Sequence, residues 1–212
     1  MTTSSYAGAV IDLVVLVADK DMEQTINELL KRPQSLGIQP ITYKIFTHPT
    51  HDSGCRTGGH ELLRPLAKQY RFALVMFDRE GSGRDASSIE AAASELVGKL
   101  AINGWADRCC VLVLDPELEI WVWTNSAELD QVIGWTGRHP QVRDWLRTQS
   151  FAISEQGKPL RPKEALRAAL REARKQPSSA LFAEIAKRVG LSRCTDPAFV
   201  QFKATVQRWF PP

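Results

Sequence analysis

Three stretches of the chain are almost entirely apolar, and amphipathic or polar segments separate them. These stretches are residues 9–18, 72–77 and 109–114, and residues 41–46 also have the pattern of a strand. The continuous apolar runs are typical of strands that are buried on both faces, rather than of half-exposed strands. Because helical patterns lie between them, the sequence predicts an α/β fold with a mostly parallel sheet covered by helices.

The segments between the predicted strands carry helical patterns. In residues 22–32, apolar side chains recur three and four positions apart, and Asp21 stands before them as a helix cap. A polar, glycine-containing loop is expected over residues 47–59, and a helix is expected to follow it at about residues 60–69. A longer helix is expected over residues 86–102, between the third and fourth strands.

Beyond Asn125 the strand patterns end, and helical patterns remain. Helices are expected at residues 127–134, 140–149, 163–175, 179–189 and 197–209. The sequence therefore predicts an α/β domain with a mostly parallel sheet over residues 8–125, and a helical C-terminal extension over residues 126–212 that packs on it.

The composition is that of an ordinary globular protein. Of the 212 residues, 43% are hydrophobic and 24% are charged, which excludes an intrinsically disordered chain. No apolar run approaches the ~18 residues that a membrane span needs, and the first five residues lack the basic region of a signal peptide. The four cysteines show no C-x-x-C spacing, which is typical of reduced thiols. We therefore expect a cytoplasmic protein without a membrane partner.

The net charge of +3 hides an uneven distribution of charge along the chain. Residues 1–157 carry 15 basic and 20 acidic side chains, whereas residues 158–212 carry 12 basic and 4 acidic ones. Such a division is typical of a protein with an acidic site in one part and an anion-binding surface in the other. A basic helix face that is simply solvated would give the same counts.

Acidic residues follow three of the four predicted strands. They are Asp19, Asp21 and Glu23 after the first strand, Asp78 and Glu80 after the third, and Asp115, Glu117 and Glu119 after the fourth. The carboxyl ends of parallel strands meet at one edge of a sheet, where ligands bind. Grouped carboxylates repel one another unless a cation neutralises them, and oxygen ligands favour Mg²⁺ or Mn²⁺. Any one of these acids could instead cap a helix, but three acidic strand ends together predict a metal site.

Several short motifs resemble a known group of proteins. The acids after strands one, three and four are similar to those of the Toprim fold of topoisomerases, primases and OLD-type nucleases. More specifically, VLVADKDME, LVMFDREGSG and LDPELEIWVW resemble the Toprim-like proteins grouped as DUF4276. The segments AEIAKRVGLS and DPAFVQFKATVQRW resemble the helical C-terminus of that group, so the similarity spans about residues 9–210. Some members resemble components of bacterial anti-phage defence systems, including methylation-associated ones, which implies a defence role with partner proteins.

The resemblance also implies roles for particular acids. Asp19 stands at or near the place of the Toprim glutamate, a general acid or base, with Asp21 and Glu23 as alternatives. The implied catalytic residues are Asp19, Asp78, Glu80 and Glu119, and the implied ligands of Mg²⁺ or Mn²⁺ are Asp78, Glu80, Glu117 and Glu119. The chain departs from the family pattern twice. Its first acid is Asp rather than Glu, and its second pair is D-x-E rather than D-x-D.

Two basic features could contact phosphate or nucleic acid. The turn at residues 81–84 directly follows the D-x-E pair, and its backbone N–H groups, with Arg79 and Arg84, could face an anion. The densest basic segment lies in the predicted helix at residues 163–175, where one side carries Arg167, Arg171, Arg174 and Lys175. A solvated face, or docking to an acidic partner protein, is equally compatible with that helix.

The predicted second strand opens into a segment with nitrogen and sulfur donors, namely His48, His51, Cys55 and His60. Such donors suit zinc, but the spacing matches no standard zinc finger. We therefore expect this segment to contribute polar groups to the rim of the site rather than to hold zinc. A nucleophilic pair of Cys55 and His60 would need a third, orienting group.

Together with the resemblance, which implies a Toprim-like (Rossmann-like) fold and a defence role, these observations predict a protein that cleaves phosphodiesters with the help of Mg²⁺ or Mn²⁺. It would be a nuclease within a bacterial defence or DNA-processing system. A non-catalytic subunit that binds nucleic acid or assembles a complex is the alternative. A nucleotide-sensing module, with phosphate bound at residues 81–84, is a third hypothesis.

Overall fold

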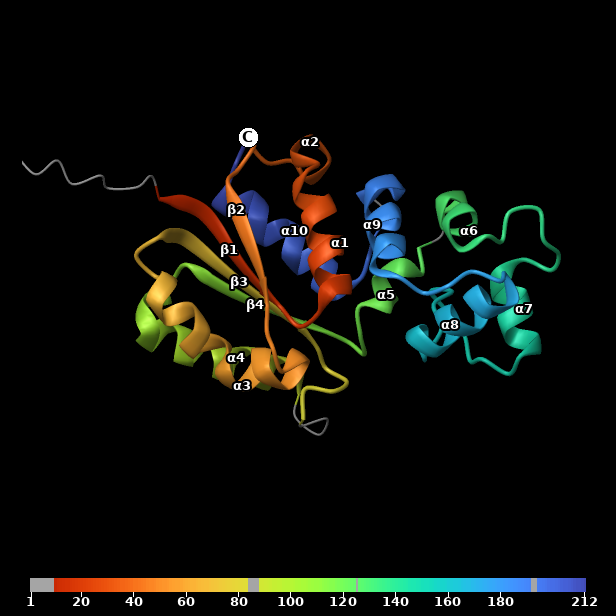
Figure 1. Cartoon of the computed structure of the whole chain (residues 1–212), viewed down its shortest axis with the longest axis horizontal. Helices are drawn as coiled ribbons and strands as arrows, with labels where there is room; N and C mark the ends of the chain where they lie inside the picture. The colour runs from red at the N-terminus through yellow and green to blue at the C-terminus, as the bar shows by residue number, and fades with distance from the viewer. Residues whose placement is uncertain (1–9, 84–87, 125, 192–193) are drawn as a thin grey trace, which may run out of the picture.

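The computed structural model describes residues 10–83, 88–124, 126–191 and 194–212, and a parallel sheet of four strands lies at its centre (Figure 1). The strand order is β2-β1-β3-β4, with bounds β1 Ile11–Val17, β2 Tyr43–Thr47, β3 Tyr70–Asp78 and β4 Cys109–Leu114. This confirms the predicted α/β class and the parallel sheet. The predicted strands correspond to the observed ones within two residues at each end.

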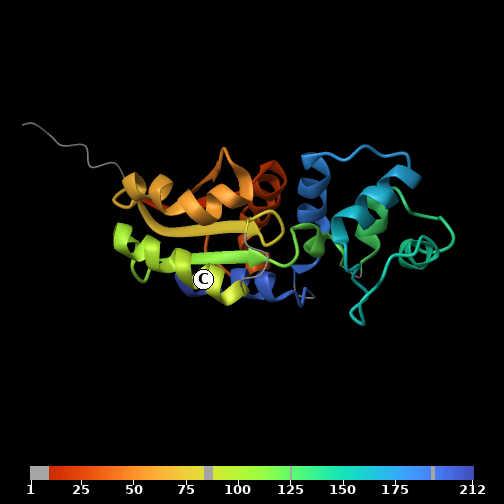
Figure 2. The same cartoon turned by 90° about the horizontal axis from the view of Figure 1, so that it is seen from below.

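Helices cover both faces of the sheet (Figures 1 and 2). One face packs against α1, Lys20–Leu30, and α10, Pro197–Trp209, and the other against α3, His51–Leu63, and α4, Ile89–Leu100. The two central strands, β1 and β3, are therefore buried on both sides, as their continuous apolar sequences predict.

The segment after β2 differs from its prediction, since the expected loop at residues 47–59 is mostly the helix α3. Its glycines allow close packing instead of ending the helix. A Cβ on Gly54 would lie 2.0 Å from Nδ1 of His48, and a Cβ on Gly59 would lie 3.1 Å from Cδ2 of Leu16 in β1. The helix that was predicted at residues 60–69 therefore begins earlier in the chain, at His51. A single 3₁₀ turn follows it at Arg64–Leu66.

The remaining helices agree with the sequence patterns in most cases. They are α2 Pro33–Leu36, η1 Arg64–Leu66, the π-turn η2 Ala101–Trp105, α5 Glu119–Val122, α6 Ala127–Ile133, α7 Val142–Thr148, α8 Pro162–Glu172 and α9 Ser179–Arg188. The helices α5 to α9 gather beyond the carboxyl ends of the strands (Figure 1). Three details differ from the sequence-based expectations: α2 and α5 were not expected, and α1 is capped by Asp19 rather than by Asp21.

The last helix returns to the sheet after this helical group. Nε2 of Gln207 in α10 donates a hydrogen bond to the carbonyl oxygen of Leu36, at 2.7 Å. The ring of Trp209 stacks on Phe72 of β3, with 4.7 Å between the ring centroids. The segment after residue 125 thus contributes both the helical group and part of the cover of the sheet. None of the helices in the described ranges is long and apolar enough to cross a membrane.

Candidate metal centre

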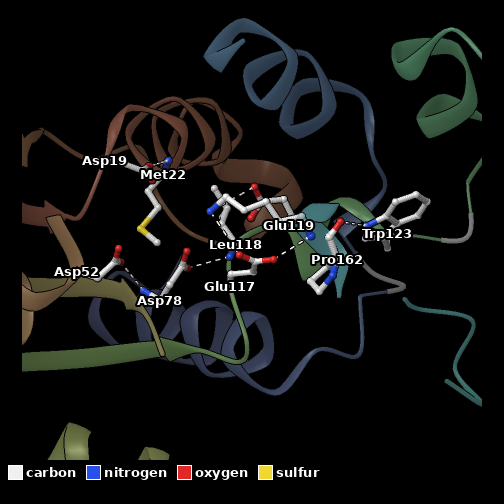
Figure 3. Close-up of polar contacts among 10 residues, drawn as sticks. Asp19, Met22, Asp52, Asp78, Glu117, Leu118, Glu119, Trp123 and Pro162 are labelled. Carbon is white, nitrogen blue, oxygen red and sulfur yellow. Dashed lines mark hydrogen bonds and ion pairs between the residues drawn. The ribbon is translucent and has the colours of Figure 1, made fainter. Parts of the chain in front are cut away.

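Three buried carboxylates meet at the carboxyl end of the sheet. Asp78 is the last residue of β3, Glu119 begins α5, and Glu117 lies two residues before it. One carboxylate oxygen from each lies within 4.8 Å of the others (Figure 3). Each residue is between 4% and 6% exposed, so water screens their mutual repulsion only weakly. We call Asp78, Glu117 and Glu119 the carboxylate cluster.

Asp78 is held in place by backbone hydrogen bonds on two sides. Its Oδ1 accepts the backbone N–H of Leu118 at 2.8 Å, which ties the end of β3 to the segment before α5. Its own backbone N–H donates to Oδ1 of Asp52 at 2.8 Å, which ties the same residue to the first turn of α3 (Figure 3). The parallel pairing of β3 with β4 places Asp78 opposite Leu114, directly before the segment that carries the two glutamates.

Two tryptophans fix the segment that carries the glutamates. Nε1 of Trp121 donates to Oδ1 of Asp196 at 2.9 Å, and Nε1 of Trp123 donates to the carbonyl oxygen of Pro162 at 3.0 Å. The first bond joins α5 to the cap of α10, and the second joins it to the first turn of α8. The helices after residue 125 therefore position two members of the carboxylate cluster.

Lys163 is the cation closest to the cluster among the described residues. Its Nζ lies 3.4 Å from Oε2 of Glu117 and 3.9 Å from Oε1 of Glu119. Its backbone N–H also donates to Oε1 of Glu117, at 2.8 Å. The sequence placed Lys163 only in a basic segment, because no local pattern shows that α8 begins beside the fourth strand's acids.

Further carboxylates surround the cluster. Asp19 caps α1, where its Oδ1 accepts the backbone N–H of Met22 at 2.9 Å (Figure 3). Asp52 lies on the first turn of α3, in the segment that was expected to contribute polar groups to the rim of the site, although no individual role was predicted for it. Asp21, on the first turn of α1, is half-buried. Burial raises the pKa of both Asp52 and Asp78, and the negative charge of Asp19 raises both further.

The electrostatics of the cluster favour a bound cation. Burial raises the pKa of Asp78 well above its ordinary value, and the charges of Asp52 and Glu119 raise it further. Burial raises the pKa of Glu119 to about 7 against the opposing charge of Lys163, and burial also raises the pKa of Glu117. Lys163 therefore offsets only part of the negative charge. Three carboxylates in this state fit a hard divalent ion such as Mg²⁺ or Mn²⁺.

No family model, curated protein or solved structure matches the chain.

Glu80 and Arg79, which directly follow Asp78 and were predicted to act in the site, lie outside the carboxylate cluster. Glu80 is exposed and is not a member of the carboxylate cluster, although its charge contributes to the raised pKa of Glu117. Arg79 forms an ion pair with Asp115, with 3.1 Å between Nη1 and Oδ1. Arg84 lies outside the described residues.

The predicted basic face of α8 is exposed, and its residues differ in their contacts. Arg167 and Arg171 lie on the exposed side of the helix, and Arg174 follows its end. Nζ of Lys175 donates to the carbonyl oxygen of Val132 at 2.6 Å, so this side chain joins the end of α8 to α6. Lys175 therefore has a contact within the protein that the sequence did not predict.

The nitrogen and sulfur donors after β2 are distributed along α3 and its entrance. Nδ1 of His48 accepts the backbone N–H of Thr50 at 3.2 Å, and Nδ1 of His51 lies 3.2 Å from the carbonyl oxygen of Ala18. Cys55 is fully buried, and burial raises the pKa of its thiol. Within the described part of the chain, the group with metal-binding geometry is the carboxylate cluster, and His48, His51, Cys55 and His60 are not members of it.

Proposed function

We propose that this chain is a Toprim-like protein of the DUF4276 kind that cleaves phosphodiesters with a bound Mg²⁺ or Mn²⁺. Nucleic acid is its proposed substrate, and other proteins of a bacterial defence or DNA-processing system are its proposed partners. The observation that carries the proposal is the carboxylate cluster, in which three buried acids from two strand ends lie within 4.8 Å of one another. Buried carboxylates of this kind are costly unless a cation or another partner compensates them.

The residues of the cluster suit a metal-holding role. Asp78, Glu117 and Glu119 would hold the ion through their oxygens, at the edge of the sheet where ligands of α/β proteins bind. When bound, such an ion activates a water molecule and stabilises the leaving oxygen of a phosphodiester. Glu80 and Asp19 lie at the margin of this centre, Glu80 exposed and Asp19 engaged in capping α1.

Other side chains of the site orient the ligands and balance their charge. Asp52 accepts the backbone N–H of Asp78 and so fixes the end of β3. Lys163 partly neutralises Glu117 and Glu119, which lowers the cost of keeping them ionised. The exposed arginines of α8, among them Arg167 and Arg171, would attract the phosphate backbone of a substrate.

A cleavage assay tests this function. The full chain is incubated with single- and double-stranded DNA and RNA, with Mg²⁺, Mn²⁺ or EDTA. We expect cleavage only with a divalent ion, and a loss of at least about a hundredfold in Asp78→Asn, since removing one metal ligand removes transition-state stabilisation. Asp144→Asn is the matched control, because Asp144 is an exposed acid of α7, paired with Arg147 and not a member of the cluster. Cleavage that survives Asp78→Asn would contradict the proposed site.

A non-catalytic assembly subunit is the second candidate function, and the ion pairs of Lys163 favour it. A lysine within 4.0 Å of both Glu117 and Glu119 could make the cluster a structural feature without a metal. This candidate predicts no cleavage with any divalent ion. It also predicts that partner binding survives Asp78→Asn.

A further inference from the structure

A pocket of about 280 Å³ lies directly beside the carboxylate cluster. Glu119 and Lys163 line it on the side of the metal centre, and Asp21 lines it from the first turn of α1. The opposite side consists of α8, α9 and the connection between them, which Figure 2 shows running from one helix to the other. The volume is near the lower end of the roughly 300–1,000 Å³ that is typical of ligand pockets. We call it the α8–α9 pocket.

The lining combines two cations, Lys163 and Arg167, and two acids, Asp21 and Glu119, with an apolar wall. Leu166 and Leu170 of α8 and Leu181 and Phe182 of α9 form the apolar part. Arg167 lines the pocket next to Leu166 and Leu170, at the edge of the exposed side of α8, and it is exposed. In the described ranges, its guanidinium has no hydrogen bond or ion pair, whereas Lys163 is engaged with the two glutamates. Arg167 is therefore the cation of the pocket that can bind an anionic ligand, although its charge also acts on Asp21 in the same lining.

The beginning of α9 adds a second group that favours an anion. Ser178 is the N-cap residue of this ten-residue helix, and both Ser178 and Ser179 line the pocket. The side chain of Ser178 does not cap the helix, and its carbonyl oxygen accepts the backbone N–H of Leu181 at 2.9 Å. The hydroxyl of Ser179 bonds Asp21 instead. Arg167 and the positive end of α9 thus meet at one pocket.

The size of the pocket limits the ligand. A volume of about 280 Å³ holds roughly one nucleotide, and the connection between α8 and α9 lines it beside the two helices. A phosphate would contact Arg167, and a base or sugar would lie against the leucines and Phe182. Because Glu119 belongs both to this pocket and to the carboxylate cluster, a nucleotide bound here would place its neighbouring phosphodiester at the metal centre.

We propose that the α8–α9 pocket binds the phosphorylated terminal nucleotide of a single nucleic-acid strand, with Arg167 as its phosphate ligand. This inference rests on the proposed function, and it adds that cleavage starts at the end of a strand. A free nucleoside monophosphate carries the same chemistry and is a second source of the ligand.

The test measures binding of single-stranded oligonucleotides by fluorescence anisotropy. DNA and RNA strands of one sequence are compared in three forms: linear with a 5′-phosphate, linear with a 3′-phosphate, and covalently closed circles. Ca²⁺, another oxygen-preferring ion, replaces Mg²⁺ in these measurements. We expect at least one linear form to bind about tenfold more tightly than the circle, the effect of one charge-assisted phosphate contact.

Two variants of α8 distinguish binding in the pocket from a general electrostatic attraction of the phosphate backbone. Arg167→Gln should remove the preference for ends, so that linear and circular strands bind alike. Arg171→Gln, one turn further along the exposed face, should weaken both forms by the same factor and keep the ratio. If a nucleoside monophosphate competes with the strand, a free nucleotide is a sufficient ligand for the pocket. If it does not compete, the pocket requires the end of a strand.

The outcome that overturns the pocket differs from the one that overturns the metal centre. If neither DNA nor RNA ends bind more tightly than circles, and no nucleoside monophosphate binds, the pocket proposal fails. Calorimetry with Mn²⁺ on the same preparations reports the metal centre independently. Intact Mn²⁺ binding without end preference refutes the pocket alone, whereas end preference without Mn²⁺ binding refutes the metal centre.

Discussion

Nζ of Lys163 lies 3.4 Å from Oε2 of Glu117, so the first turn of α8 supplies the positive charge that partly balances the carboxylate cluster. Lys163 and the cluster come from parts of the chain that the sequence pattern assigns to different domains. The helical segment after residue 125 is therefore part of the site itself.

Replacing Lys163 by Met removes the cation and keeps much of the apolar stem. Without a divalent ion, we expect the free energy of unfolding at pH 8 to fall by about 1 kcal/mol, since Lys163 is partly exposed and its ion pairs are partly screened. Mn²⁺ should bind the variant several-fold more tightly, because Lys163 no longer repels the ion. Urea unfolding and calorimetry measure the two effects, with Arg171→Met as the control. Weaker Mn²⁺ binding in the variant would contradict this role for Lys163.

The stability of the metal-free protein should depend on Glu119. Its pKa rises from 4.5 in the unfolded chain to about 7 in the folded protein, because burial disfavours the charged form. The stabilising contribution of Glu119 to the free energy of unfolding is therefore fully present below pH 4.5, and it is lost as the pH rises through about 7. The loss amounts to about 3 kcal/mol at pH 8. The raised pKa values of Asp78 and Glu117 act in the same direction.

Glu119→Gln isolates this effect. With EDTA present, the variant should gain stability relative to the natural chain as the pH rises from 5 to 8, because an amide does not ionise. Urea unfolding at each pH measures the difference. A difference that stays constant across this range would show that Glu119 does not titrate as the geometry requires.

The packing of α3 gives a prediction independent of the metal centre. Gly54→Ala would place a Cβ 2.0 Å from Nδ1 of His48, so we expect a loss of about 1–3 kcal/mol from overpacking. Gly98→Ala in α4 is the matched control. No described atom lies within 4 Å of its added Cβ, and alanine should stabilise that helix by about 0.5–1 kcal/mol. Thermal unfolding compares the two. Equal melting temperatures for both variants would contradict the close approach of His48.

The strands and most helices of this fold could be predicted because their signals are local. Residues 72–77 and 109–114 are continuous apolar runs, and β3 and β4 form there. The helix α3 could not be predicted in the same way. Gly54 and Gly59 are loop signals in a sequence, and only the packed structure shows that His48 and the sheet need the space.

The candidate site could be predicted only in part, for a related reason. Asp78, Glu117 and Glu119 follow strands, and the parallel sheet brings strand ends together. Lys163 and Asp52 enter the site through the packing of α8 and α3, which no spacing in the sequence reveals. Glu80 was predicted as a ligand because it follows β3 as the resemblance implies. Its side chain is exposed, and it is not a member of the cluster.

The central claim is that the carboxylate cluster binds a divalent ion, and isothermal titration calorimetry with Mn²⁺ tests it most directly. The natural chain and Asp144→Asn should both bind Mn²⁺, whereas Asp78→Asn should bind it at least tenfold more weakly while keeping its far-ultraviolet circular dichroism. Binding should tighten as the pH rises from 5 to 8, because Glu119 must lose its proton to ligate the ion. No binding by the natural chain, or equal binding by Asp78→Asn, would contradict the account.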